Sequence, residues 1–220
     1  MSTELYYDSI ANDLASWMNE FDLRTRLEWF EHQIRKHSPD GLALDVGSGL
    51  GQFSQLIAHH GGRPISLDIS ARLLARTDNE RRVRASALRL PFADCSLPIV
   101  ISSECVEHTP DPIAAVQEMV RVLQPGGVLI LSCPNRAWRW TVPWATKLGV
   151  RRFTGLENWP GRREVRMALT NAGADIVVDE GLYLLPFQLR PLWPLIAWLN
   201  RTGQTLRGLM INQCWVAKRR

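Results

Sequence analysis

Apolar residues follow two different spacings along the chain. In the first part they recur with the period of a helix, which predicts helical structure up to about His37. The residues at this spacing are Leu14, Trp17, Met18, Leu23, Leu27, Phe30 and Ile34. From residue 42 onward the apolar runs are short, as in buried strands, and helical spacing returns between them.

The short runs predict strands at 42–46, 64–67, 82–85, 98–102, 128–132, 174–178 and 210–216. Helices are predicted at 53–59, from the N-cap Ser70 through Leu74, and from Asp111 to the Pro-Gly-Gly stop at 125–127. Strands that alternate with helices pair in parallel through right-handed crossovers. We therefore expect a Rossmann-like α/β fold with a seven-stranded, mostly parallel sheet, helices on both faces, N-terminal helices and a C-terminal aromatic-rich insertion.

The length of 220 residues suits a single α/β domain. We divide it into an N-terminal helical cap (1–39), a ligand-binding core (40–135) and a lid with the final strands (136–220). Apolar residues make up 45% and charged residues 22% of the chain, which is ordinary for a domain that buries a core.

The net charge is +4, and the arginines fall in short groups rather than in one stripe. This scatter is typical of a solvated surface; it argues against a nucleic-acid partner and leaves an anionic substrate or a membrane surface open. The four cysteines form no C-x-x-C pair, so we expect reduced thiols in a cytoplasmic protein. The start of the chain has no basic-then-apolar signal pattern. The apolar run at 192–199 is shorter than the roughly 20 residues of a membrane span, so at most peripheral membrane contact is expected.

A glycine-rich bend follows the first predicted strand in Leu44-Asp45-Val46-Gly47-Ser48-Gly49-Leu50-Gly51. Glycines here let the backbone turn tightly and approach a ligand closely. The dinucleotide fingerprint G-x-G-x-x-G wants its third glycine one residue later, where Gln52 stands. Asp45 would also repel a pyrophosphate but would attract the ammonium group of an amino-acid ligand, directly or through water.

Asp68 ends the second predicted strand. A carboxylate at that place can accept hydrogen bonds from both ribose hydroxyls of a nucleoside. Nicotinamide enzymes use the same contact, so Asp68 alone does not discriminate. Together with Asp45 it predicts a nucleoside with an amino-acid tail; the alternative is a tight loop and a helix-start acid. Farther on, Leu90-Pro91-Phe92 is a weaker signal for contact with the adenine.

The segments DVGSGLG, LDIS, ASALRLPFADCS, SSECVEHTPDP, RVLQPGG and SCPN occur in the order found in class I S-adenosylmethionine-dependent methyltransferases, over roughly residues 40 to 135. The chain resembles that superfamily. More loosely, ECVEHTPDP, GLENW and GLYLLP are similar to its ubiquinone-biosynthesis O-methyltransferase branch.

The resemblance implies S-adenosylmethionine as cofactor and S-adenosylhomocysteine as product. The cofactor-binding residues that we predict are Asp45, Gly47, Ser48, Gly49, Gly51, Asp68, Ile69, Ser86, Ala87, Leu88, Ser103 and, from the leading helices, Arg26. Two positions depart from the superfamily pattern. Ser86 stands where many relatives carry an aspartate near the adenine, so that contact would be weaker or would be made by the Ala87 backbone. Pro98 replaces the usual aspartate before the fourth strand and belongs at a strand start because it lacks an N–H.

His108 is the one histidine expected at the mouth of the fourth strand. An imidazole can take a proton from a hydroxyl acceptor near neutral pH, so His108 is the candidate catalytic base. The alternative is a structural role in the loop. Glu104, Glu107 and His108 also form E-x-x-E-H, which is a candidate Mg²⁺ site of low weight because no fourth ligand is evident.

The tryptophan-rich region from residue 138 and the apolar insertion at 184–207 are expected to form the lid over the acceptor. Three interpretations stay open: an aromatic-lined acceptor pocket, a membrane-facing patch, or surface that completes the core or a dimer. Asn135 either orients the acceptor or caps the next turn.

The sequence thus predicts methyl transfer to a small-molecule or lipid-like acceptor, preferably at oxygen. The alternatives are a nucleic-acid or protein methyltransferase, a non-catalytic cofactor-binding protein and a nicotinamide dehydrogenase. The oligomeric state is not predicted.

Overall fold

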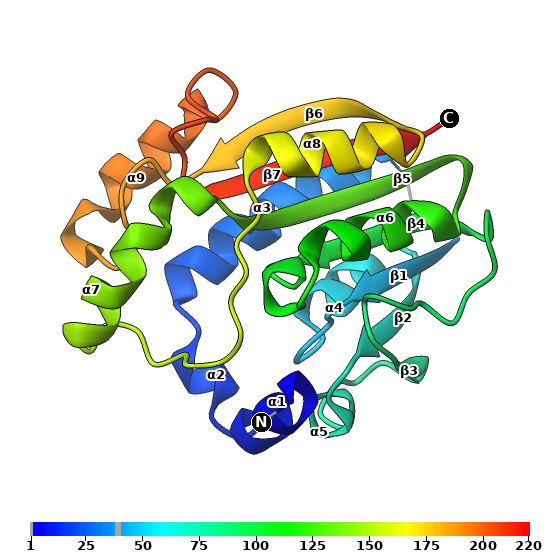
Figure 1. The fold of residues 1–220 in the computed structure, drawn as a ribbon, viewed down its shortest axis with the longest axis horizontal. Coiled ribbons are helices and arrows are strands. Elements are labelled where there is room, and N and C mark those ends of the chain that lie inside the picture. The colour runs from blue at the N-terminus through cyan, green and yellow to red at the C-terminus, as the bar shows by residue number, and fades with distance from the viewer. Residues whose placement is uncertain (1, 38–40) are drawn as a thin grey trace.

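A seven-stranded sheet with strand order β3-β2-β1-β4-β5-β7-β6 runs through the molecule (Figure 1). The computed structural model describes residues 2–37 and 41–220. Its strands are β1 (Leu42–Val46), β2 (Arg63–Asp68), β3 (Arg82–Arg84), β4 (Leu97–Ser103), β5 (Leu123–Pro134), β6 (Ala174–Leu182) and β7 (Asn212–Arg219). Strands β1 to β5 pair in parallel, whereas β7 runs antiparallel to β5 and β6. The predicted Rossmann-like, mostly parallel fold is confirmed.

Helices cover both faces of the sheet. They are α1 (Thr3–Ile10), α2 (Leu14–Trp17), α3 (Glu20–His37), α4 (Gln52–His59), α5 (Ala71–Leu74), α6 (Pro112–Val122), α7 (Val142–Lys147), α8 (Arg162–Asn171) and α9 (Trp193–Leu199). Four 3-10 turns add to them: η1 (Val106–His108), η2 (Arg136–Thr141), η3 (Arg190–Leu192) and η4 (Asn200–Thr202). In Figure 1, α6 and α8 lie in front of the sheet, and α3 lies behind it.

The two largest apolar clusters of the core form layers, one on each face of the sheet. On β5, Leu129 and Leu131 join the layer under α6 and α8, whereas Ile130 joins the layer under α3 and α4. This alternation follows from the two-residue period of a strand. On the second face, Phe30 of α3 packs its ring edge-on against Phe53 of α4, with centroids 4.8 Å apart.

Local sequence explains where two of the helices begin. The Ser70 hydroxyl accepts from the Leu73 amide at 3.1 Å, which confirms it as the N-cap of α5. Asp111 caps α6 by accepting from the Ile113 and Ala114 amides, with Pro112 at the first helical position. Both caps place the preceding loops at the carboxyl edge of the sheet.

The N-terminal region is three helices rather than one continuous run. The backbone of Met18 is extended, and the Asn19 side chain accepts from the Asp22 amide at 3.1 Å, so Asn19 starts a new helix. The matching sequence signal is that the predicted apolar spacing steps by five positions from Met18 to Leu23, instead of three or four. The predicted boundary between residues 39 and 40 lies outside the described residues.

The prediction that the Pro-Gly-Gly segment at 125–127 ends a helix is wrong. The segment lies within β5. Helix α6 stops at Val122, and Leu123 already pairs with Leu97, before a register shift to the pair Ile99 and Val128. A Cβ on Gly127 would lie 2.8–3.1 Å from three backbone carbonyls, so only glycine fits this bulge. Strands β6 and β7 also run farther than predicted, to Leu182 and Arg219.

Replacing Phe30 with alanine should lower the free energy of unfolding by about 3–5 kcal/mol, because the ring is fully buried between α3 and the sheet. Urea denaturation measures the loss. The control is Met167→Ala, at a side chain that is 50% exposed on α8, which should change stability by less than about 0.5 kcal/mol. Equal effects of the two variants would contradict the assignment of Phe30 to the core.

Candidate functional site

The crevice at the carboxyl edge of the sheet forms where the strand order reverses. The chain passes from β1 to β2 on one side, and β4 pairs with β1 on the other side. Loops that leave neighbouring strands in opposite directions open a ligand site at that point. The Gly47–Gly51 bend follows β1 here, and residues 104–108 follow β4.

The glycine bend takes backbone conformations that side chains disfavour. Gly47, Gly49 and Gly51 have φ angles of +73°, +54° and +85°. A Cβ on Gly47 would lie 2.3 Å from the Cys105 sulfur, so the bend packs directly against the loop after β4. A Cβ on Gly49 would meet nothing within 4 Å, so this part of the bend faces open space.

Asp68 fastens the bend to the end of β2. One carboxylate oxygen accepts from the Gly49 amide and the other from the Ser70 amide, both at 2.9 Å. The side chain is 7% exposed, and burial raises its pKa although both hydrogen bonds lower it. The predicted residues Asp68, Gly47 and Gly49 are therefore brought together, and Ile69 follows directly at the same turn.

Asp45 lies beneath the bend. Its carboxylate accepts from the Ser54 hydroxyl at 2.7 Å, and Ser54 in turn contacts Ser66 at 2.7 Å. Burial raises the pKa of Asp45 to about 7. Its position beneath the loop favours an indirect electrostatic effect on a ligand over a direct contact. The Ser48 hydroxyl, by contrast, is buried without a hydrogen-bond partner among the described residues.

The predicted adenine segment lies beside Asp68. The Ala85 amide donates to the Asp68 carbonyl at 3.1 Å. Residues 86–88 come directly after Ala85 in the chain and therefore begin next to Asp68. The Ser86 hydroxyl accepts from the Leu88 amide at 3.2 Å, which makes it part of a local turn. Ala87 is buried and Leu88 half-buried, both packed with the first core layer.

A buried polar chain crosses the other half of the crevice. Arg26 of α3 pairs with Asp22 at 2.9 Å and donates to the Ser103 hydroxyl at 2.8 Å. Ser103 contacts Ser132 at 3.2 Å, and Ser132 donates to the Glu104 carboxylate at 2.9 Å. Arg26 and Ser103, predicted separately, thus lie in direct contact at the end of β4.

The candidate Mg²⁺ triad is not formed. Glu104 has a left-handed backbone (φ +52°) that turns its carboxylate to Ser132, while the His108 ring bonds the Leu156 carbonyl. No three His, Cys, Asp or Glu residues gather as a metal site within 2–37 and 41–220. The spacing of E-x-x-E-H was misleading because the left-handed turn at Glu104 directs its carboxylate to Ser132.

His108 is held as a neutral imidazole. Its Nδ1 lies 2.9 Å from the Leu156 carbonyl, which can only accept, so Nδ1 carries the proton and Nε2 is free to accept. Burial lowers the pKa of His108 to about 4, and nearby Arg151 adds to the effect. Nε2 lies 3.7 Å from a Glu107 oxygen. The other Glu107 oxygen is buried without a partner in the described part of the chain, and burial raises the pKa of this carboxyl.

Two aromatic residues near His108 were missed by the sequence analysis. The centroids of Tyr7 and Phe153 lie 5.7 Å and 4.7 Å from that of the His108 ring. Tyr7 comes from α1 and Phe153 from the segment after α7, so no local spacing relates them to His108.

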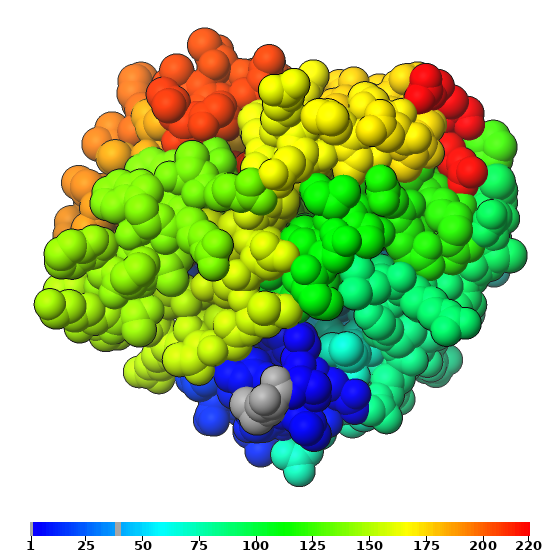
Figure 2. Space-filling view, viewed as in Figure 1, coloured from blue at the N-terminus to red at the C-terminus, as the bar shows by residue number. Residues whose placement is uncertain are grey.

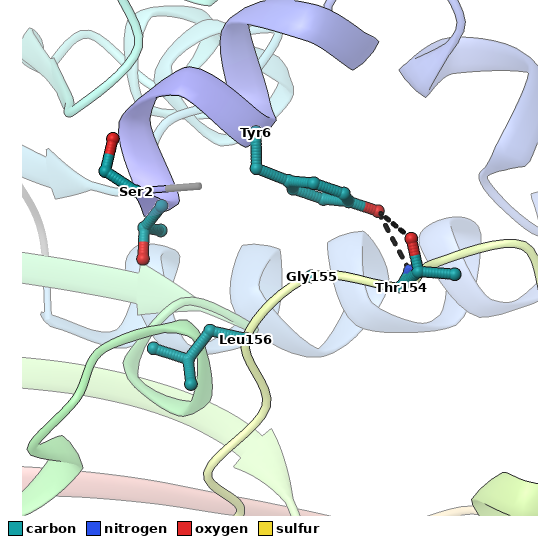
Figure 3. A pocket seen from close by; sticks show the side chains of 6 residues that line it. Ser2, Tyr6, Thr154, Gly155 and Leu156 are labelled. Atoms are coloured by element: carbon teal, nitrogen blue, oxygen red, sulfur yellow. Dashed lines mark hydrogen bonds between the residues drawn. The ribbon is translucent and has the colours of Figure 1, made fainter.

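The same two segments meet again beside a pocket of about 250 Å³ (Figure 3). Tyr6 reaches across from α1, and its hydroxyl accepts from the Thr154 amide at 2.9 Å. The pocket is lined by Ser2, Thr3, Tyr6, Thr154, Gly155 and Leu156. The N-terminal helix and the 151–157 segment thus contact each other, and both also contact the His108 ring.

The residues of the predicted lid differ in burial and contacts. Asn135 caps η2 by accepting from the Ala137 amide and donates to the carbonyls of Gly208 and Met210, so its structural interpretation is the one observed. Trp159 is buried, and Trp193 stacks on Phe21 with centroids 5.0 Å apart. The exposed tryptophans are Trp140, Trp144 and Trp198. Within the described ranges no helix is long and apolar enough to cross a membrane.

The central part of the chain is similar to known proteins. Residues 44–131 match a family described as a methyltransferase domain. An uncharacterized methyltransferase of Mycobacterium sp. (strain JLS) is 35% identical over 132 residues, which cover 58% of this chain and 49% of that protein. The chain therefore spans about half the length of this relative.

Solved structures share the fold at low sequence identity. An S-adenosylmethionine dependent methyltransferase from Mesorhizobium loti matches with a TM-score of 0.64 at 20% identity, over 88% of this chain and 98% of that one. The [4+2]-cyclase SpnF matches with a TM-score of 0.71 at 18% identity, over 100% and 97%.

Glu104→Gln should gain stability relative to the wild type as pH rises. Burial raises the pKa of Glu104 to about 7, above roughly 4.3 in an unfolded chain. The carboxyl of Glu104 therefore contributes its whole stabilisation at pH values below its pKa in the unfolded chain. This stabilisation is lost as the pH rises through its pKa in the folded protein. Between pH 5 and 8 the difference in unfolding free energy should shift by about 1–3 kcal/mol in favour of the variant.

Urea denaturation across that pH range measures this difference. Glu28→Gln, on the exposed side of α3, is the matched control. A difference between Glu104→Gln and wild type that stays constant with pH would contradict the buried, proton-binding state of Glu104.

Proposed function

We propose, from the premise that the chain carries a methyltransferase domain on a class I methyltransferase fold, that it transfers the methyl group of S-adenosylmethionine to a small-molecule or lipid-like acceptor. The target atom that we favour is oxygen. One observation carries the proposal: an open bend of left-handed glycines lies between two buried aspartates. Such a site suits a nucleoside with a positively charged amino-acid tail and disfavours a pyrophosphate.

The residues at the bend fit S-adenosylmethionine. The Gly49 position faces open space, and the unpartnered Ser48 hydroxyl offers a hydrogen bond within the same loop. In the proposed complex Asp68 takes the ribose hydroxyls, with Ile69, Ser86, Ala87 and Leu88 around the adenine. Gly47, Gly51, Ser103 and Arg26 border the amino-acid tail, and Asp45 adds negative potential from beneath.

When bound, S-adenosylmethionine supplies a methyl group on a sulfonium, which is already activated for displacement. The protein has to hold the acceptor in line and exclude water, and alignment alone can supply roughly 7–11 kcal/mol of the barrier. In the proposal, Tyr7 and Phe153 exclude water, because their rings lie against His108 at the mouth of the crevice.

His108 is the proposed base. Because Nδ1 is engaged by Leu156, Nε2 is the atom that accepts the proton of the acceptor hydroxyl. With a pKa of about 4, His108 is a weak base. A weak base is sufficient here, because the proton on the acceptor oxygen becomes strongly acidic once that oxygen gains the methyl group. The neighbouring Glu107 carboxyl, 3.7 Å from Nε2, then stabilises the imidazolium when it is ionised.

The acceptor class rests on the character of the lid. The tryptophan-rich 138–159 segment and the apolar insertion favour an aromatic or isoprenoid acceptor over a nucleic acid. The looser resemblance to the ubiquinone-biosynthesis O-methyltransferases points to the same class. Since the fold is shared with a cyclase, cofactor binding and methyl transfer have to be tested separately.

Replacing Asp68 with alanine should weaken the binding of S-adenosylhomocysteine by about 1.5–3 kcal/mol, the value of hydrogen bonds to a charged group. Calorimetry measures the affinity, with NADH as the competing ligand class. The control is Asp175→Ala, whose side chain is 67% exposed near the start of β6. Unchanged affinity in Asp68→Ala would place the ribose elsewhere, and binding of NADH alone would refute the proposed cofactor.

Replacing His108 with alanine should reduce kcat about 10²–10⁴-fold with little change in S-adenosylhomocysteine affinity, which is the range for loss of a general base. In the wild type, protonation of His108 should reduce kcat only as pH falls toward 4, because that is where the imidazole gains its proton. Methyl release with a panel of phenolic and isoprenoid hydroxyl compounds gives the rates. His59→Ala, at the exposed end of α4, is the control. Full activity of His108→Ala would eliminate it as the base.

A further inference from the structure

Exposed apolar side chains gather on two segments, 136–156 and 181–211. Thirteen large apolar side chains are exposed in the described part of the chain, and ten of them lie in these segments, which hold less than a quarter of the residues. The most exposed are Leu148 at 74%, Trp140 at 67%, Trp144 and Leu209 at 61%, and Trp198 at 59%. Surface of this kind on one part of a protein marks an interaction site.

The two segments also carry charge of only one sign. They contain eight arginines and lysines and no aspartate or glutamate. Three of these cations pair with acids outside the segments: Arg136 with Glu164, Arg151 with Glu157, and Arg207 with Asp179. The remaining five have no ion pair within the described residues: Arg139, Lys147, Arg152, Arg190 and Arg201. The surface therefore combines exposed tryptophan and leucine with uncompensated positive charge.

Both segments leave the sheet at one edge. The first follows the end of β5, and the second connects the end of β6 to the start of β7, whose Asn212 pairs with Pro134. The Trp138 indole donates to the Leu209 carbonyl at 2.9 Å, which links them directly. Figures 1 and 2 show both on the left of the molecule, α7 in yellow-green and α9 in orange. This is also the edge that holds the glycine bend.

We propose that the surface formed by η2, α7 and the η3–α9–η4 insertion docks on an anionic lipid bilayer. Tryptophan and leucine enter the boundary between headgroups and acyl chains, while arginine and lysine contact anionic headgroups. Lys147 lies 5.9 Å over the Trp144 ring and Arg190 lies 5.8 Å over the Trp193 ring, so cation and aromatic side chains already occur as pairs. A second copy of this chain would bring the same positive charges together, which disfavours self-association through this face.

The charge pattern is what selects a bilayer as the partner. An apolar surface for a protein partner needs no excess of one charge. The negative potential of a lipid surface, in contrast, increases the partitioning of a protein about fivefold for each nearby cation. The docking does not depend on methyl transfer. It holds the carboxyl edge of the sheet at the membrane, where an acceptor dissolved in lipid would be found.

Co-sedimentation with vesicles tests the proposal. The full chain should bind vesicles of 70% phosphatidylcholine and 30% phosphatidylglycerol at low salt. Binding should be weaker to pure phosphatidylcholine and should fall as salt screens the charges. Trp140→Ser, Trp144→Ser and Trp198→Ser combined should reduce partitioning at least about tenfold. The charge variant, Lys147→Gln, Arg190→Gln and Arg201→Gln, should reduce it by about fivefold per residue.

Matched controls remove equal numbers of exposed side chains elsewhere. Leu5→Ser, Met167→Ser and Val177→Ser combined match the tryptophan variant, and Arg63→Gln, Arg81→Gln and Arg163→Gln combined match the charge variant. Both controls should bind vesicles like the wild type. Circular dichroism and S-adenosylhomocysteine binding verify that each variant is folded.

Three results would overturn the proposal. The wild type does not bind anionic vesicles at low salt, or the patch variants bind as well as their controls. Alternatively, light scattering finds a wild-type dimer that the triple tryptophan variant dissociates, in which case the surface is an interface between two copies. None of these readouts measures methyl transfer, so a failure here leaves the proposed activity standing.

Discussion

The site depends on the pair of hydrogen bonds that the Asp68 carboxylate accepts from Gly49 and Ser70. They join the bend after β1 to the turn after β2, so two loops that are 19 residues apart take one fixed arrangement. A buried carboxylate is costly unless backbone donors compensate for it, and both of its oxygens are engaged here. The bend can then keep its three left-handed glycines in place, with the Gly49 position facing open space.

The two halves of the crevice are lined by different polar groups. On the side of β1 and β2, two buried aspartates lie at or beneath the glycine bend. On the side of β4, Arg26 is bound to Asp22 and Ser103, and a neutral His108 lies beyond. In the proposed reaction the first half binds the positively charged cofactor and the second half receives an uncharged acceptor. The N-terminal helix and the 151–157 segment contact the His108 ring in the second half, where the methyl group must be kept from water.

Local patterns predicted the features that depend on local physics. The strand, glycine bend and helix at 42–59 could be located because each follows from residues within one short segment. The Ser70 cap and the acid at Asp68 were accessible for the same reason. The Pro-Gly-Gly bulge in β5 was missed because pairing with Leu97, a distant residue, decides it.

Long-range contacts limited the prediction of the site. Tyr7 and Phe153 meet His108 from elements about a hundred and about forty-five positions away in the sequence, and no spacing signals this. The E-x-x-E-H spacing suggested a metal triad, but the left-handed backbone at Glu104 turns that carboxylate to Ser132 instead. Arg26 was a candidate only through resemblance, and its contact with Ser103 appears only in three dimensions.

A crystal structure with bound S-adenosylhomocysteine is the most direct measurement of the central claim. The account predicts the ligand over the Gly47–Gly51 bend, with both ribose hydroxyls on the Asp68 carboxylate and no ligand group where a pyrophosphate would lie. A ligand seated elsewhere, or a ribose that does not touch Asp68, would contradict it.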